Sequence, residues 1–286
     1  MTKHRKNCKR QSLPPILQSN TTVGQSGLYL LPPIDGLYLR LIGCGGGGAG
    51  ANIDRINLIS SGGGGGGSGT INYIELPGRS RYSLISINIG LPGIGGIVGQ
   101  DGGDGQNVKI NIYDFSQKCR KIGKLIASLH AIGGKGGKCG INSVTGGNGG
   151  DGNYPGGGGG GRDIGGKGGK GYSDDIFAED GLTLSSGMRG GNGYNNDPSG
   201  ANGIVLSNPT KIVAGGAGGG GPDGGLGGGY ALTAIEGSPF SGSGGSGGGG
   251  LDEFSPKGAN GANGSIGSIW VQYALAPPKE KNANKI

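Results

Sequence analysis

The chain has 286 residues, of which 77 are glycine, about four times the usual share of that residue in a soluble protein. Hydrophobic residues make up 32% and aromatic residues 5% of the sequence, which alone would favour disorder over a packed core. Proline contributes only 14 residues and Gly-X-Y is not sustained, which excludes a collagen triple helix. The formal net charge is +7, and cations crowd both ends of the chain, at Lys3, Arg5, Lys6, Lys9, Arg10, Lys279, Lys281 and Lys285.

The N-terminal stretch MTKHRKNCKRQSLPPILQSN is basic and lacks the apolar core of a secretory signal. No window of the sequence approaches the ~18 apolar residues that a membrane helix needs. We therefore expect a protein that is made in the cytoplasm without conventional export and has no membrane span. Its expected parts are a basic flexible arm over residues 1–26, one glycine-rich domain over residues 27–275, and a basic flexible tail over residues 276–286.

Between the glycine tracks, apolar and polar residues alternate with a period of two, which is typical of β-strands that bury one face. In LYLRLI, for example, Leu37, Leu39 and Leu41 share one face. The pattern recurs in TINYIEL, SLISINI, VKINIY, LIASLHAI and SIWVQYAL, at residues 70–76, 83–89, 108–113, 125–132 and 268–275. No stretch shows a helical period over three turns, so the sequence predicts an all-β protein.

Two segments beside these strands are interpreted as turns. The dipeptide at Pro77 and Gly78 is a turn signal and is expected to end the strand before it. The stretch DFSQKCRKIGK, residues 114–124, is interpreted as a basic loop between two strands. Neither segment is expected to extend the strands that flank it.

The glycine tracks have a period of three residues. In GGKGGKCG, residues 133–140, Lys135 and Lys138 occupy every third position, and the scheme recurs in GGNGGDG and GANGANGSIG, at residues 146–152 and 258–267. A polyproline-II backbone has three residues per turn, so every third side chain lies on one edge and the other edges are bare backbone. The backbone groups of such a helix have no partner within the segment. We therefore predict that the tracks pack against one another as a bundle held by the strands.

The order of these features resembles the glycine-rich domains of bacteriophage tail fibres and adhesins. The resemblance begins with SGLYLLPPIDGLYLRLIGCGGGGAGA at residues 26–51, continues with SSGGGGGGSGT at 60–70, and closes with GANGANGSIGSIWVQY at 258–273. It implies a β-sandwich framework whose glycine-rich insertions form a bundle of polyglycine-II helices. It also implies a non-catalytic structural or adhesive protein. The abundance of Ile, Asn and Lys indicates an AT-rich genome, which would fit a large DNA virus.

In that family, turns at the tip of the glycine bundle contact a receptor. The corresponding turns here hold the candidate receptor-contact residues Tyr154, Tyr172, Phe177, Tyr194 and Phe240. The structural alternative is that these aromatic side chains seal turns or bury a small core. The expected location is the virion, where the basic arm would bind other particle or fibre proteins. A homo-oligomer is compatible with the resemblance, although the sequence shows no coiled coil to drive one.

No catalytic, cofactor-binding or metal-binding site is expected. GCGGGG at residues 43–48 matches G-x-G-x-x-G, but more glycine follows it, where a dinucleotide site needs a helix and an acidic residue. Gly-Lys is never followed by Ser or Thr in the lysine-bearing tracks, which excludes a P-loop there. The four cysteines form no C-x-x-C pair, and the two histidines are His4 and His130.

Two other functions remain open. The first is a cellular matrix or coat protein in which the glycine array serves only as scaffold. The second is nucleic-acid binding by the basic residues Lys3 to Arg10, whose signature would be strongly salt-dependent binding. Against the second, RGG occurs once, at residues 189–191, and no RNP-like aromatic strand is present.

Overall fold

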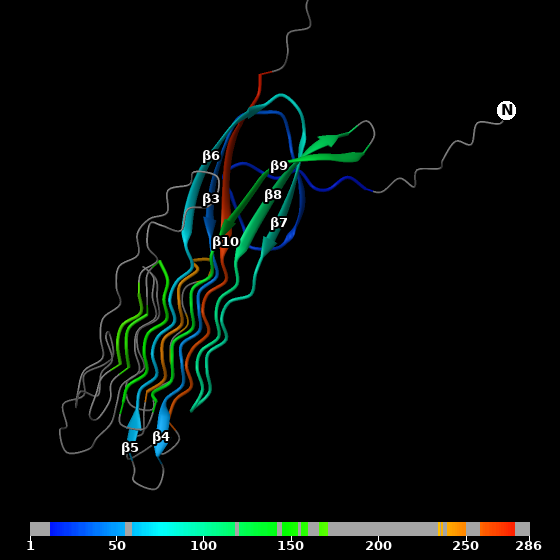
Figure 1. Cartoon of the computed structure of the whole chain (residues 1–286). Coiled ribbons are helices and arrows are strands. Elements are labelled where there is room, and N and C mark those ends of the chain that lie inside the picture. The colour runs from blue at the N-terminus through cyan, green and yellow to red at the C-terminus, as the bar shows by residue number, and fades with distance from the viewer. Residues whose placement is uncertain are drawn as a thin grey trace, which may run out of the picture.

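The computed structural model of the protein describes residues 12–54, 59–117, 120–141, 145–153, 156–159, 166–170, 234, 236, 239–249 and 258–277. These residues form strands and glycine tracks, and no helix occurs among them. Two antiparallel sheets make a sandwich, and the glycine tracks extend from one end of it as a long bundle (Figure 1). The prediction of an all-β framework with a glycine bundle is therefore confirmed.

Each sheet of the sandwich has four antiparallel strands. The first has the order β1-β10-β3-β6, with strands Thr21–Val23, Ser268–Leu275, Ile34–Ile42 and Ile71–Arg79. The second has the order β2-β7-β8-β9, with strands Gly27–Leu31, Ser83–Ile89, Val108–Ser116 and Lys121–Ala131. A small hairpin of β4 (Asn52–Asp54) and β5 (Ile59–Ser61) lies at the far end of the bundle (Figure 1).

The sandwich is held by the faces that the alternation predicted to be buried. Leu37, Leu39 and Leu41 of β3 belong to one buried cluster with Ile85 of β7 and Ile110 of β8, from the opposite sheet. Burial of one such side chain contributes about 1.5–3 kcal/mol. The cluster is confined to the strands and to Leu17 and Cys44, so side-chain burial stabilises the sandwich far more than the bundle.

The framework begins earlier than residue 27. Strand β1 pairs with β10, and the side chain of Leu17 is only 2% exposed. The carbonyl of Leu17 accepts a hydrogen bond from the Tyr273 hydroxyl at 2.6 Å. Residues 12–26 therefore belong to the sandwich, and assigning them to a flexible arm was wrong, because a three-residue strand offers no alternation to recognise. Residues 1–11 and 278–286 lie outside the described residues.

Both predicted turns beside the strands were wrong. Strand β6 continues through Pro77, which pairs with Gly36 of β3. The proline is tolerated because β6 is the edge strand of its sheet, where a missing N–H breaks no ladder. In the stretch 114–124, the first residues continue β8 and the last begin β9, so the supposed loop is the tip of a long hairpin.

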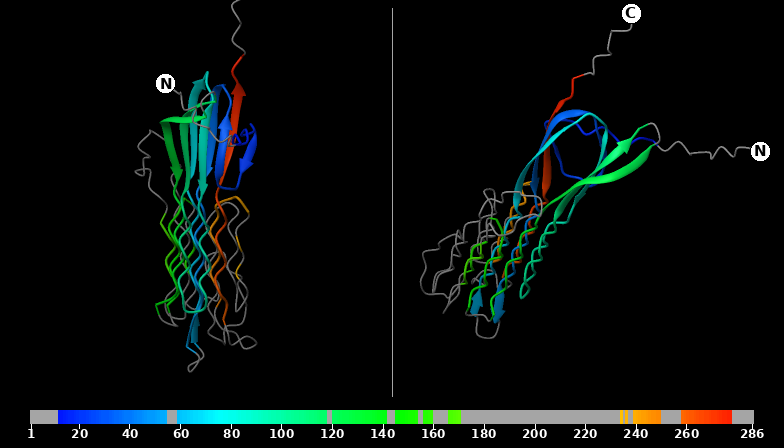
Figure 2. Two further views of the ribbon diagram at one scale, coloured as in Figure 1. Left: turned by 90° about the vertical axis from the view of Figure 1, so that its right-hand side faces the viewer. Right: turned by 45° about the horizontal axis from the view of Figure 1, so that its top comes forward.

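Residues 43–51, called the central track, show how the bundle is built. All nine of their N–H groups donate to carbonyl oxygens of other tracks. Successive residues donate in turn to three segments, residues 64–70, 100–106 and 259–265. Seven of their carbonyl oxygens accept from N–H groups within residues 93–99, 134–137 and 245–248. The central track thus has six hydrogen-bonded neighbours, which run beside one another along the bundle (Figure 2). A repeat of three with no internal hydrogen bonds is the geometry of packed polyglycine-II helices.

Glycine is required in these tracks because the backbones approach one another closely. A Cβ placed on Gly46 or Gly136 would lie less than 3.0 Å from a neighbouring carbonyl, closer than real Cβ atoms come to other heavy atoms. Positive φ explains few of the described glycines, since only Gly99, Gly242 and Gly258 have it. Close approach of backbones, and not backbone conformation, therefore selects the glycines of the bundle.

Candidate interaction site

The structure describes only one of the five aromatic residues predicted to contact a receptor. Tyr154, Tyr172, Phe177 and Tyr194 lie outside the described residues. Phe240 is 48% exposed, and its ring lies against Gly24, where a Cβ would strike it. Its carbonyl accepts a hydrogen bond from the Ser268 hydroxyl at 2.8 Å, at the start of β10. Phe240 therefore lies where the bundle joins the sandwich and not at the far end of the bundle.

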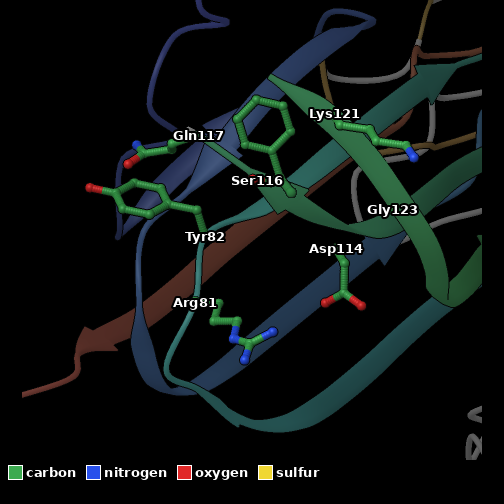
Figure 3. Close-up of a pocket in the computed structure, with 8 residues that line it drawn as sticks. Arg81, Tyr82, Asp114, Ser116, Gln117, Lys121 and Gly123 are labelled. Carbon is green, nitrogen blue, oxygen red and sulfur yellow. The ribbon is translucent and has the colours of Figure 1, made fainter. Parts of the chain in front are cut away.

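A depression of about 880 Å³ lies on the sandwich, at the end away from the bundle. It opens between the connection that follows β6 and the tip of the β8–β9 hairpin (Figure 3). Its lining residues are Arg81, Tyr82, Asp114, Phe115, Ser116, Gln117, Lys121 and Gly123. We refer to it as the basal depression, since the first and last described residues of the chain also lie at the sandwich (Figure 1).

Bulges in the β8–β9 hairpin open the basal depression. The register between β8 and β9 shifts on both sides of Tyr113, and such bulges bend a strand and increase its twist. The hairpin tip consequently projects from the sandwich (Figure 1). Ile122, Leu125 and Ile126 of β9 are exposed on this projection, in contrast to the buried residues further along the strand.

The basal depression is basic. Arg81 and Lys121 line it, and Arg120 and Lys124 lie on the same hairpin. Asp114 points into the depression but forms an ion pair with Arg79, so its charge is offset (Figure 3). Cations beside the rings of Tyr82 and Phe115 suit an acidic segment that also carries apolar side chains. The surface can hold such a partner by contact.

Cys44 and His130, two further residues of reactive types, lie in the framework. The Cys44 thiol donates to the Gly90 carbonyl and accepts from the Gly267 N–H, at 3.1 and 3.2 Å, and burial raises its pKa. His130 is half-buried in β9, and its carbonyl accepts a hydrogen bond from the Asn72 side chain. Within the part of the chain that the structure describes, no cluster of three His, Cys, Asp or Glu could hold a metal ion.

The sequence did not reveal the role of the Asn and Asp residues at every third position of the outer tracks. Their side-chain oxygens accept hydrogen bonds from backbone N–H groups of the adjacent track and thereby extend the lattice at its surface. The pairs are Asp101 with Cys139, Asp104 with Gly136, Asn107 with Gly133, Asn148 with Lys167, Asp151 with Lys170, Asn260 with Val98, and Asn263 with Gly95. The recurrence of Asn and Asp in GGNGGDG, DGGDGQN and GANGAN was the signal that could have predicted it.

The fold and these surfaces define a glycine-rich β-protein. It has a sandwich framework and a bundle of glycine tracks joined by backbone hydrogen bonds. A family model described as "Glycine-rich domain" matches residues 22–274, which is most of the chain. The chain therefore belongs to this family of glycine-rich domains. A search of curated proteins found none that matches. Among the described residues, no helix is long and apolar enough to cross a membrane.

Proposed function

We propose that this protein is a non-catalytic structural and adhesive component of a viral particle or fibre, which holds a rigid glycine stem toward a host surface. The observation that carries the proposal is that the two ends of the molecule differ. The first and last described residues lie at the sandwich, and so does the basal depression. The bundle extends away from the sandwich (Figure 2). A body that is anchored at one end and stiff along its length suits a fibre or spike.

The backbone lattice supports a rigid stem. Successive amides of the central track donate in turn to three different chain segments, so bending the bundle would break hydrogen bonds in several tracks at once. An unpaired buried N–H or C=O costs about 1–3 kcal/mol. A stem of this kind keeps its far end at a fixed distance from the framework, which an adhesive protein needs and a flexible linker does not provide.

The basal depression is the proposed anchor. Its cations favour an acidic surface on a neighbouring particle protein, and its partly exposed rings supply apolar contact. The basic segment Lys3 to Arg10 would add to this attraction, although it lies outside the described residues. The same charges keep nucleic-acid binding open as a second function, with salt-dependent binding to random DNA as its signature.

Antibody labelling tests the proposal against a cellular scaffold. Antibodies against the soluble domain should label the surface of purified particles, and excess soluble domain should reduce attachment of those particles to cells. Replacing Lys121 and Lys124 with glutamate should lower incorporation into particles and leave the folded domain intact. Labelling confined to a cell wall or matrix, with no label on particles, would contradict the viral role and favour the scaffold.

A further inference from the structure

A groove of about 710 Å³ lies along the bundle, away from the basal depression. Its walls come from the tracks at residues 134–138 and 166–170, and its floor is the track at residues 147–151. The lining residues are Asp104, Lys135, Gly136, Lys138, Asn148, Gly149, Gly150, Asp151, Lys167, Gly168, Gly169 and Lys170. We refer to it as the lysine groove, because four of these residues are lysines.

The lysines form two rows, one on each wall. Lys135 and Lys138 lie three residues apart on one wall, and Lys167 and Lys170 lie three apart on the other. Three residues of a polyglycine-II helix advance by about 9 Å, so each row presents cations at about that repeat. The repeated GGKGGK of the sequence is thus brought together across one groove, which the sequence alone did not show.

The backbone fixes the two rows relative to each other. The Lys135 N–H donates to the Asp151 carbonyl, and the Lys170 N–H donates to the Asp151 side chain. Asn148 makes the equivalent pair of contacts, since its carbonyl accepts from the Lys138 N–H and its side chain from the Lys167 N–H. The track between the walls therefore spaces the lysines, and the groove is formed before any ligand binds.

The groove has an excess of positive charge. Its lining contains four lysines and two aspartates, a net formal charge of +2. Lys135 pairs with Asp104 at 2.8 Å, and Lys138 pairs with Asp101 at 3.1 Å, but all four of these side chains are at least half exposed. Exposed pairs are worth about 0–1 kcal/mol, so a stronger anion can displace them. Lys167 and Lys170 form no ion pair with any described residue.

We propose that the lysine groove binds a linear anionic polysaccharide, whose sulfate or carboxylate groups are spaced by its sugar repeat. The floor carries only Asn148 and Asp151 besides glycine, and both side chains accept hydrogen bonds from the Lys167 and Lys170 N–H groups. The sugar chain can therefore approach the floor, where the lysine rows meet its charges on both sides. No aromatic residue occurs among the described lining residues. A nucleic acid would therefore find phosphate partners but nothing on which its bases could stack. The biological role of this binding rests on the proposed adhesive function.

The test uses the whole purified chain and a size-defined heparin oligosaccharide as the probe, with calorimetry at two salt concentrations. Replacing Lys167 and Lys170 with glutamine should weaken binding about tenfold. The slope of log K against log salt should fall by about two. The matched control replaces Lys121 and Lys124 with glutamine, which removes the same charge from the β8–β9 hairpin at the basal depression and should change affinity less than twofold. Melting temperature and backbone exchange in residues 43–51 check that each variant is folded.

Each other outcome overturns the proposal. Absence of binding by the unmodified chain, or equal binding by the Lys167 and Lys170 variant, would exclude the groove as the site. Loss of binding in the Lys121 and Lys124 control would place the site on the β8–β9 hairpin at the basal depression. Binding of single-stranded DNA with higher affinity than heparin, if it is lost in the Lys167 and Lys170 variant, would assign the groove to nucleic acid. None of these outcomes concerns antibody labelling of particles, so failure of the groove and failure of the viral role are distinguishable.

Discussion

The sandwich and the bundle of this protein achieve close packing in opposite ways. In the sandwich, Leu39 of β3 and Ile110 of β8 are completely buried, and side chains fill the space between two sheets. In the bundle, the central track is equally buried, but its neighbours are backbone groups joined by hydrogen bonds. The first region buries apolar area, whereas the second leaves almost no room for a Cβ.

This difference determines how each region tolerates substitution. A hydrophobic core accepts residues of similar volume, and such exchanges usually cost less than about 1.5 kcal/mol. In the outer tracks, such as residues 133–138, the glycine positions leave no room for a Cβ, while every third position faces outward and accepts a larger side chain. In the central track even three successive glycines, Gly46 to Gly48, leave no room for one. The core of the sandwich is therefore selective for side-chain volume, whereas most packed positions of the bundle are selective for glycine.

The largest effect is expected for Gly136→Val. A Cβ there would meet the Gly102 carbonyl, which belongs to a backbone fixed by its own hydrogen bonds and cannot move aside. We expect a loss of more than about 5 kcal/mol, sufficient to prevent folding of the bundle. Circular dichroism and hydrogen exchange across residues 133–140 would measure it. Lys135→Gln in the adjacent position is the control and should change stability by less than about 0.5 kcal/mol. Equal stability of the two variants would refute the close-packed lattice.

A somewhat smaller effect is expected for Leu39→Ala in the sandwich. The side chain is fully buried, so its loss removes apolar burial and leaves a cavity, which together cost about 2–5 kcal/mol. Denaturant unfolding would measure this loss. Leu39→Met is the matched control, since it conserves volume and should cost less than about 1.5 kcal/mol. A variant that unfolds only the sandwich, with slow exchange retained in residues 43–51, would show that the two regions are independent.

The sequence predicted the sandwich strands and the glycine tracks because both have a clear period. Alternation located β3, β7 and β10 closely, since each buries one face. It failed at β1 and at the tip of the β8–β9 hairpin, because a short strand and a projecting strand bury too little to alternate. Pro77 was taken for a turn because its position at a sheet edge is a property of the topology.

The interaction surfaces were harder to predict for a similar physical reason. Lys135 and Lys170 are far apart in the sequence and become neighbours only through the order in which tracks pack. The basal depression depends on the bulges between β8 and β9, which no local sequence pattern predicts. Phe240 was assigned to a turn of the bundle, which is correct locally, but its place beside Gly24 follows from the return of the chain to β10.

A moderate effect is expected for Asn263→Ala, because the side chain of Asn263 takes the place of a backbone carbonyl as a hydrogen-bond acceptor at the edge of the bundle. The Asn263 side chain accepts the Gly95 N–H at 2.8 Å, at an exposed edge of the lattice. Asn263→Ala should cost about 1 kcal/mol, because water can partly replace the lost acceptor. The Gly95 amide should then exchange faster in NMR-detected hydrogen exchange. The Gly96 amide, which donates to the Gly48 carbonyl, is the internal control and should keep its rate. Equal acceleration of both amides would mean that the edge is not separately stabilised.

The smallest effect is expected for Asp104, whose carboxylate forms an ion pair with Lys135 of an adjacent outer track. Burial would raise the pKa of this carboxyl, but hydrogen bonds from Lys135 and the Gly136 N–H, together with nearby lysine charge, outweigh burial and lower the pKa. A pKa that is lower in the folded chain contributes stability at pH values above the unfolded pKa, and that contribution is lost as pH falls through the folded value. Stability should therefore decline slightly below about pH 4. In Asp104→Asn, which keeps an acceptor for Gly136 but cannot titrate, this part of the decline should be absent. Parallel melting curves of the two proteins between neutral and acidic pH would measure the difference. If both lost stability equally, the charge of Asp104 would contribute nothing to stability, and the contrast between charged edge and uncharged centre would disappear at this site.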